Sequence, residues 1–110
     1  MKMLFVALSL MASINTYIPD VESAGEYRIT EYCQFCNDPE GYESASGEKL
    51  HEGDCAMNGV PLGTEIMIDG ETYVVKDRCG IENTVDIFKE TEGGCHCERM
   101  ECKEVSIIRK

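Results

Sequence analysis

Residues 66–75 read Ile66-Met67-Ile68-Asp69-Gly70-Glu71-Thr72-Tyr73-Val74-Val75 and hold two strand-like runs on either side of an Asp-Gly pair. An Asp-Gly pair is a strong hairpin signal, because a two-residue type I′ turn needs a positive φ at both central positions. Val, Ile and Tyr also favour strands, where branched and aromatic side chains pack on a pleated surface. We therefore expect a β-hairpin here, and it sets the fold class for the rest of the chain.

Short strand patterns continue on both sides of this hairpin. Residues 26–33 place Tyr27 and Ile29 on one side and Arg28, Thr30 and Tyr32 on the other, which is the alternation of a strand. The chain shows almost no helical period. We predict an all-β fold with six strands, which are Glu26–Cys33, Asp54–Asn58, Gly63–Asp69, Glu71–Asp77, Asn83–Phe88 and Lys103–Arg109. A closed barrel is favoured over a sandwich, because closure removes exposed strand edges.

The composition excludes several classes of protein. The chain has 110 residues, with 10 Lys and Arg against 21 Asp and Glu, and a net charge of −11. Such a chain has too few cations to follow a phosphate backbone, so we expect no nucleic-acid partner. The same charge disfavours an anionic membrane surface. An apolar content of 43% is too high for a disordered chain, so we expect one small folded domain that is a monomer.

The first 24 residues predict a signal peptide. A short basic start, Met1-Lys2-Met3, precedes the apolar run of residues 4–12, which is too short to span a bilayer. Cleavage is expected after Ser23 or Ala24. Removal of residues 1–24 would leave residues 25–110 as one domain, secreted or associated with the cell wall and without membrane contact. The alternatives are a buried N-terminal strand or an uncleaved anchor, and Pro19 with the polar residues near it weakens both.

The chain has seven cysteines, and they favour disulfides, because small exported domains often need covalent crosslinks to stabilise a thin core. An odd number leaves one thiol over, and the sequence does not choose among the possible pairings. The alternative is zinc, since Cys33-x-x-Cys36 together with Cys95-His96-Cys97 and Cys102 offers more than four soft ligands. The seven cysteines are Cys33, Cys36, Cys55, Cys79, Cys95, Cys97 and Cys102.

Five motifs carry a resemblance to a known family. In chain order they are Thr30-Glu31-Tyr32-Cys33, Ser44-Ala45-Ser46-Gly47, Val60-Pro61-Leu62-Gly63-Thr64, Val74-Val75-Lys76-Asp77-Arg78-Cys79-Gly80 and Thr84-Val85-Asp86-Ile87-Phe88. Their order and spacing resemble the 3D domain, a double-psi β-barrel named for three aspartates and found in bacterial cell-wall lytic enzymes. Rare lipoprotein A-like and barwin/expansin-like proteins use a similar barrel. The resemblance covers Tyr27 to Arg109 and implies a small six-stranded double-psi β-barrel.

The resemblance also implies a set of site residues. The second family aspartate matches Asp77 and the third matches Asp86, whereas the first falls on Asn58. It implies that Asp86 is the catalytic acid/base, that Asp77 lines the same cleft, and that Asn58 and Thr64 contact substrate. It implies no cofactor and no catalytic metal. The Cys-rich segment 92–102 has no counterpart in the family pattern, so contacts from that side are not implied.

The residues themselves are compatible with this assignment. Val85 and Ile87 would share one face of a strand, leaving Asp86 and Phe88 on the other. If a second carboxyl group shares the cleft, repulsion between the two charges raises the pKa of one of them, and that group can stay protonated as a general acid. The bland alternatives are a turn-forming Asp77 and an Asp86 that bonds backbone amides.

The sequence thus predicts a secreted peptidoglycan lytic transglycosylase, in which one aspartate is sufficient because the sugar's own 6-hydroxyl is the nucleophile. The alternative is a non-catalytic module that binds a cell-wall glycan. Asn58 in place of an aspartate and the Cys-rich segment permit that alternative.

Overall fold

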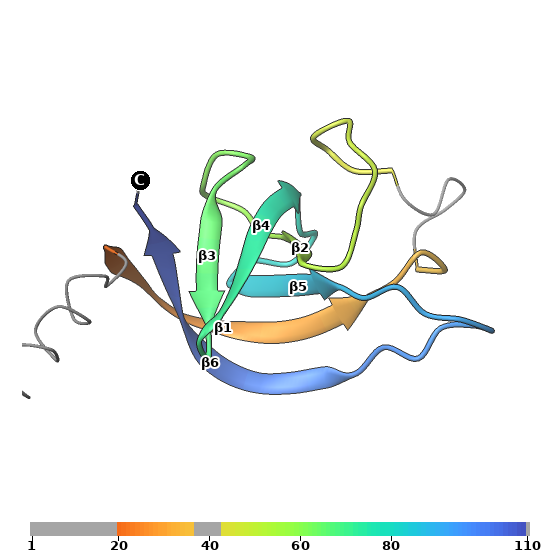
Figure 1. The fold of residues 1–110 in the computed structure, drawn as a ribbon. Helices are drawn as coiled ribbons and strands as arrows, with labels where there is room; N and C mark the ends of the chain where they lie inside the picture. The colour runs from red at the N-terminus through yellow and green to blue at the C-terminus, as the bar shows by residue number, and fades with distance from the viewer. Residues whose placement is uncertain (1–19, 37–42, 110) are drawn as a thin grey trace, which may run out of the picture.

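The computed structural model describes residues 20–36 and 43–109. The apolar run of the expected signal peptide lies outside these residues. Within them the chain forms six strands that close into one barrel in the order β1-β5-β2-β4-β3-β6 (Figure 1). The all-β barrel predicted from the sequence is confirmed. The strands are β1 (Val21–Tyr32), β2 (Asp54–Ala56), β3 (Glu65–Ile68), β4 (Glu71–Asp77), β5 (Thr84–Phe88) and β6 (Arg99–Ile108).

The barrel is mixed and has an internal two-fold pattern. β1 pairs with β5 in parallel and β2 pairs with β4 in parallel, whereas the other neighbours are antiparallel. If β1, β2 and β3 are exchanged with β4, β5 and β6, each strand keeps the same kind of neighbours around the barrel. These two interlocked parallel crossovers are the topology of a double-psi barrel. In the described part of the chain, no helix is long and apolar enough to cross a membrane.

The β3–β4 hairpin forms as the Asp-Gly pair predicts. Asp69 and Gly70 have φ values of 52° and 81°, and Ile68 pairs with Glu71 across the turn. Both central residues therefore lie in the left-handed region that a type I′ turn requires. The turn fixes the register of β3 on β4, which places Ile66 and Ile68 in the core.

Two apolar clusters lie on opposite faces of the strands. Alternation along each strand sends every second side chain inward, so all six strands contribute to the interior, with branched residues from five of them and Cys55 from β2. The interior cluster is Ile29, Cys55, Met57, Ile66, Ile68, Val75, Val85, Ile87 and Val105. A smaller cluster lies outside the barrel, where Leu50 from the β1–β2 connection covers the outer face of β2 and β5. This outer cluster is Tyr32, Leu50, Ala56 and Phe88, with Cys79 against its edge.

Strands β1 and β6 are longer than the sequence predicts. β1 begins at Val21, and Val21 to Ser23 pair with Ser106 to Ile108 of β6. The predicted start was missed because the pairing is irregular between Ser23 and Gly25, which breaks the alternation. Cleavage after Ser23 or Ala24 would remove this first segment of β1 and leave the pairing from Gly25 onward. The domain boundary therefore stays a prediction.

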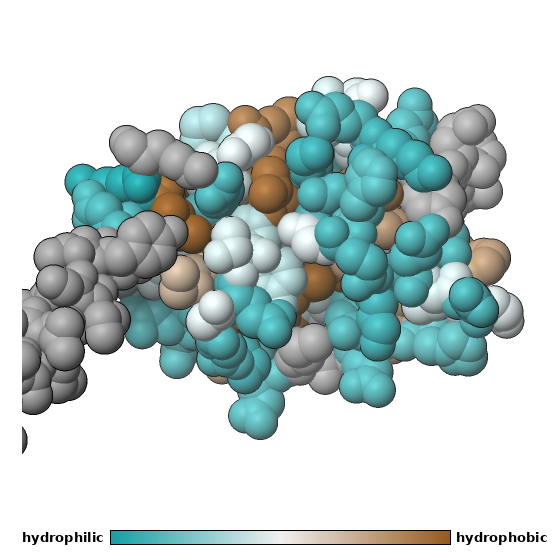
Figure 2. Space-filling view, viewed as in Figure 1, coloured by the Kyte–Doolittle hydropathy of each residue, from teal (hydrophilic) through white to brown (hydrophobic). Residues whose placement is uncertain are grey.

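The surface is mainly polar. Figure 2 shows hydrophilic residues over most of one face, with hydrophobic residues visible only in small areas between them. The large apolar side chains exposed among the described residues are Val21, Phe35, Leu62 and Ile81, and they come from separate segments. Single exposed apolar residues of this kind are ordinary on soluble domains.

Candidate functional site

The two predicted acids lie in one row across the outer face of the barrel. Ala56 of β2 pairs with Asp77 of β4 on one side and with Asp86 of β5 on the other. Thr30 of β1 pairs with Asp86 and extends the row. Two strand spacings separate the backbones of the two aspartates by about 10 Å. The small Ala56 side chain lies between them and is buried in the outer cluster, so both aspartates belong to the same outer face.

A β-bulge turns Asp77 toward this surface. Val75 lies in the interior cluster, and simple alternation would point Asp77 inward as well. Instead, Cys55 pairs with Val75 while the next residue, Ala56, pairs with Asp77, so Lys76 is an extra residue in β4. A bulge of this kind re-aims the side chains that follow it. The single extra residue therefore moves Asp77 to the outer face that Asp86 also occupies.

The carboxylate of Asp77 accepts three hydrogen bonds. The Ala45 and Arg78 backbone N–H groups each donate to its Oδ1 over 2.9 Å. The Tyr32 hydroxyl donates to its Oδ2 over 3.3 Å. Ala45 belongs to the Ser44-Ala45-Ser46-Gly47 motif, so this contact joins two of the motifs that the sequence singles out. The orientation of the carboxylate is therefore fixed from three directions.

Asp86 is half-buried, and the pKa of its carboxyl group is raised. Burial raises the pKa of its carboxyl group above the ordinary value for aspartate, and the negative charges of Asp77 and Glu31 raise it further. A hydrogen bond from Thr30 Oγ1 to Asp86 Oδ1, 2.8 Å long, opposes this shift in part. Asp86 therefore keeps its proton to a higher pH than a free aspartate does, which is the property required of a general acid.

Tyr32 is a site residue that the sequence analysis did not identify. Its ring is buried and packs edge-on against Phe88, with centroids 5.3 Å apart and an angle of 75°. Burial raises the pKa of its hydroxyl, and the charges of Asp77 and Asp86 raise it further, so Tyr32 stays a proton donor. The alternation of residues 26–33 places Tyr32 on the same side of the strand as Thr30, and this pattern is the sequence signal that identifies Tyr32 as a candidate site residue.

Asn58 and Thr64 are the two predicted substrate contacts. Their side chains form hydrogen bonds with backbone groups of the protein. The Asn58 side chain donates to the Cys79 carbonyl over 2.7 Å and accepts from the Cys79 N–H over 3.0 Å. Thr64 Oγ1 donates to the Pro61 carbonyl over 2.6 Å. Both side chains therefore stabilise turns. Asn58 fixes the loop that follows Asp77, which gives it an indirect part in the site.

Replacing Asn58 by Asp is expected to destabilise the protein by about 1–2 kcal/mol. A carboxylate can accept from the Cys79 N–H but cannot donate to the Cys79 carbonyl, so the second oxygen would face a carbonyl oxygen. Chemical denaturation of the variant measures the change in unfolding free energy. Asn83→Asp is the matched control, because Asn83 is exposed and its left-handed φ of 55° suits Asp nearly as well. Equal stability of Asn58→Asp and the natural protein would show that the loop does not depend on this amide.

A connection between β1 and β2 covers the outer face beside Asp77. Leu50 is fully buried in the outer cluster, and the Ser46 N–H donates to the Lys76 carbonyl over 3.0 Å. Lys76 Nζ also forms an ion pair with Glu48, 2.6 Å long. The bulge residue Lys76 is thus bonded through both its backbone and its side chain. These contacts hold the serine-rich motif over the aspartate row.

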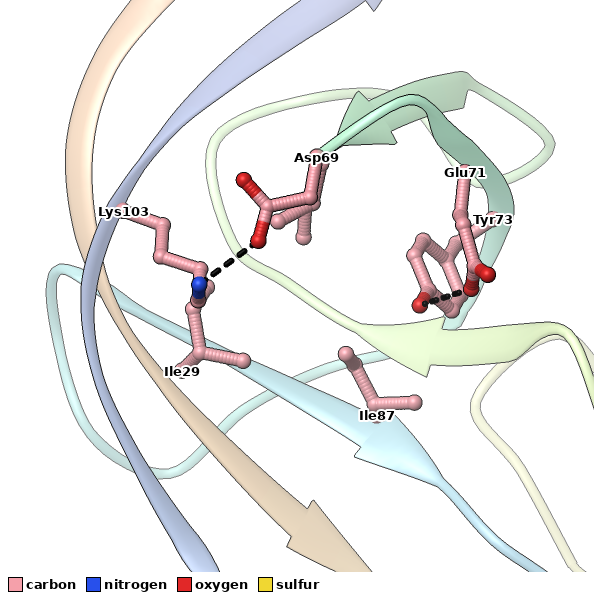
Figure 3. A pocket seen from close by; sticks show the side chains of 7 residues that line it. Ile29, Asp69, Glu71, Tyr73, Ile87 and Lys103 are labelled. Atoms are coloured by element: carbon pink, nitrogen blue, oxygen red, sulfur yellow. Dashed lines mark hydrogen bonds and ion pairs between the residues drawn. The ribbon is translucent and has the colours of Figure 1, made fainter.

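A cavity of about 240 Å³ lies at another position, at the hairpin end of the barrel (Figure 3). Ile29 and Ile87 line it, and they lie on the interior face of their strands, opposite to Asp86. Lys103 forms an ion pair with Asp69 across this cavity, with 2.6 Å between the charged atoms. The cavity is partly closed by that pair, and neither predicted acid lines it.

Four thiols form a second cluster, next to the end of β1. The Sγ atoms of Cys33, Cys36, Cys95 and Cys97 all lie within 4.8 Å of one another. Burial raises the pKa of Cys33, but hydrogen bonds with Thr91, the Phe35 N–H and the thiols of Cys95 and Cys97 together outweigh it and lower the pKa to about 7. Burial raises the pKa of Cys36 and of Cys97.

No two cysteine sulfur atoms lie at disulfide distance in the described residues, so the expected disulfides stay a prediction. All seven cysteines are free thiols, and even Cys36 and Cys95 have their Sγ atoms 3.4 Å apart, against about 2.05 Å in a disulfide. Cys55 lies in the interior cluster, and Cys102 is exposed on β6. The odd count is explained without pairing, because four thiols gather at one place and three lie apart from them.

Comparison of the chain with models of protein families, with curated proteins and with solved structures gave no match.

Proposed function

We propose that the protein is a secreted or cell-wall-associated lytic transglycosylase that cleaves the glycan strand of peptidoglycan at the Asp86 face. The observation that carries the proposal is the half-buried Asp86, whose pKa is raised by burial and by the nearby Asp77. A carboxylic acid of this kind can donate a proton at a pH where ordinary aspartates are ionised. Asp77 and Asp86 lie on the same outer face of the barrel, on either side of the buried Ala56.

The chemistry needs one acid that works twice. Asp86 donates its proton to the glycosidic oxygen as the bond to the anomeric carbon breaks. The 6-hydroxyl of the same sugar attacks that carbon, and the Asp86 carboxylate then takes the hydroxyl proton, which restores the acid and leaves a 1,6-anhydro ring. No water is consumed. The intramolecular attack replaces the second carboxylate of an ordinary glycosidase, which activates water or acts as nucleophile.

Asp77 has a positioning part in this scheme. Its carboxylate accepts from Tyr32 and from two backbone N–H groups, so its charge stays at a fixed place beside Asp86. That charge favours the protonated form of Asp86 before reaction. The buried Tyr32 hydroxyl stays neutral and helps to hold the Asp77 carboxylate in place.

The second candidate is a non-catalytic module that binds a cell-wall glycan. It is favoured by Asn58, which stands in place of the first family aspartate and bonds the Cys79 backbone, because one acid of the lytic pattern is then missing while the barrel remains. The net charge of −11 repels the anionic peptide stems of peptidoglycan at low salt, and this repulsion opposes wall binding by the enzyme and by the module alike.

Digestion of purified peptidoglycan, followed by mass analysis of the soluble products, separates these functions. Anhydro-muropeptides support the transglycosylase. Products heavier by one water indicate a hydrolase and contradict the proposed mechanism. Retention of the protein on the insoluble wall without any product supports the binding module. If the protein releases no product and is not retained on the wall, both proposals are overturned.

The Asp77→Asn variant is expected to move the pH profile of cleavage toward acid. Activity requires protonated Asp86, so it falls as the pH rises through the pKa of that group. Removing the Asp77 charge lowers the pKa of Asp86, because that charge helps to raise it. The basic limb of kcat/KM against pH therefore shifts to lower pH. An unchanged limb, or a shift to higher pH, would remove Asp77 from the electrostatic scheme.

A further inference from the structure

We infer that Cys33, Cys36, Cys95 and Cys97 bind one Zn²⁺ ion in a closed, structural four-thiolate site. Such a site joins the end of β1 to the β5–β6 connection.

The spacing of the four sulfur atoms fits a tetrahedron around zinc. A Zn–S bond of about 2.3 Å places tetrahedral sulfur ligands about 3.8 Å apart. Cys36 Sγ lies 3.7 Å from Cys33 Sγ, 3.4 Å from Cys95 Sγ and 3.7 Å from Cys97 Sγ. Cys95 and Cys97 are 3.6 Å apart. These separations are too long for disulfides and close to those of a shared metal ion.

The exposure of the cluster argues against ordinary packing. Cys33 is buried and Cys97 is half-buried, but Cys36 and Cys95 are exposed. Free thiols that serve only as small apolar groups are usually buried, and they gain little from meeting at a surface. A bound metal ion would explain why four thiols converge at a surface, because ions such as zinc prefer soft thiolate ligands.

Independent contacts hold the two ligand segments in place. In the first segment, the Cys36 N–H donates to the Cys33 carbonyl over 2.9 Å, which forms the turn between the first two ligands. The Gln34 side chain then bonds both the N–H and the carbonyl of Thr91, at 3.1 and 2.6 Å. The two segments are therefore joined by groups that are not ligands.

The second segment is bonded to β1 on the far side of the cluster. The Glu98 N–H donates to the Glu31 carboxylate over 3.0 Å, and the Glu31 N–H donates to the Glu98 carbonyl over 3.1 Å. A site held on both sides in this way loses little conformational entropy when it binds an ion. Because all four ligands come from the protein, the ion has no open position and the site is structural.

We assign the ion as zinc, and iron is the alternative that the metal analysis tests. Four thiolates in a tetrahedron suit zinc or iron, and zinc gives a colourless site without redox chemistry. His96 stands between two of the ligands in sequence, but its side chain is exposed and the cluster consists of the four thiols alone. Each thiol must lose its proton to bind the ion, so binding releases protons and weakens as the pH falls.

The ion would also support the aspartate face. Cys33 follows Tyr32 directly, and the Lys89 N–H donates to the Tyr32 carbonyl over 2.7 Å. Fixing Cys33 against the β5–β6 connection therefore fixes the strand position from which Tyr32 reaches Asp77. Metal binding itself is measured without any glycan, so its result does not depend on the catalytic proposal.

The test is the metal content of the full-length chain purified under reducing conditions and dialysed against Zn²⁺. Elemental analysis is expected to find one zinc per chain. Cobalt(II) in place of zinc should give the visible ligand-field bands and thiolate charge-transfer bands of a tetrahedral four-sulfur site. Absence of stoichiometric metal, bound iron in place of zinc, or cobalt bands of an octahedral site would overturn the assignment.

Two variants and a matched control assign the ligands. Cys36→Ser and Cys95→Ser exchange exposed ligands and are expected to lose the four-sulfur cobalt spectrum and most of the bound zinc. Cys102→Ser removes an exposed thiol outside the cluster and should keep one zinc. Circular dichroism of each variant checks that the barrel persists. Loss of zinc from Cys102→Ser alone, or full retention by both cluster variants, would contradict the assignment.

Discussion

Glycan cleavage by the Asp86→Asn variant is expected to fall by about 10²–10⁴-fold, the usual contribution of a general acid–base group. An amide cannot donate a proton to the leaving oxygen or accept one from the attacking hydroxyl. It can still bond Thr30 Oγ1, so the strand pairing should survive. The measurement is the initial rate of anhydro-muropeptide release. Glu101→Gln, at an exposed carboxylate on β6, is the control and should keep full activity.

The same substitution should stabilise the protein at neutral pH. The folded-state pKa of Asp86 is raised, so its contribution to stability is present in acid and is lost as the pH rises through that pKa. The Asn variant has no charge to bury. The difference in unfolding free energy, variant minus natural protein, should therefore grow between acid and neutral pH. Cleavage retained at the natural rate, or a variant less stable at neutral pH, would contradict the part given to Asp86.

Replacing Phe88 by Ala is expected to lower the unfolding free energy by about 3–5 kcal/mol, a large part of the stability of so small a domain. Phe88 is 1% exposed and packs edge-on against Tyr32 in the outer cluster. Its loss would leave a cavity beneath Leu50 and free the ring that aims the Tyr32 hydroxyl at Asp77. Urea denaturation followed by circular dichroism measures the change.

Phe35→Ala is the matched control for this prediction. Phe35 is 55% exposed, so the same truncation should change stability by less than about 0.5 kcal/mol. Equal losses in the two variants would mean that Phe88 is not a core residue. Phe88→Leu keeps most of the buried volume and is expected to lie between the two.

The sequence predicts those parts of the fold that depend on neighbouring residues. The Asp-Gly pair determines the hairpin, because positive φ values are a local requirement that few residues meet. The alternation around Asp86 places it opposite Val85 and Ile87, which lie in the interior cluster. Both features can be read from a few consecutive residues.

The remaining features depend on residues distant in the chain. The extra residue Lys76, which turns Asp77 outward, arises from the register between β2 and β4, and no local pattern specifies that register. The bonds of Asn58 to Cys79 involve backbone groups that have no signature in sequence. Composition favoured disulfides, whereas the parallel pairing of β1 with β5 brings two pairs of cysteines from distant segments into one cluster.

The place of β6 in the strand order has a consequence for how the chain acquires its structure. β6 is the last strand in sequence, and it closes the barrel between β1, the first, and β3. The barrel therefore cannot close before β6 has left the ribosome. Contacts of such long sequence separation give slow folding, on the order of milliseconds to seconds. Until β6 is present, β1 and β3 keep unpaired edges, so a partly synthesised chain exposes strand edges with which other chains can pair.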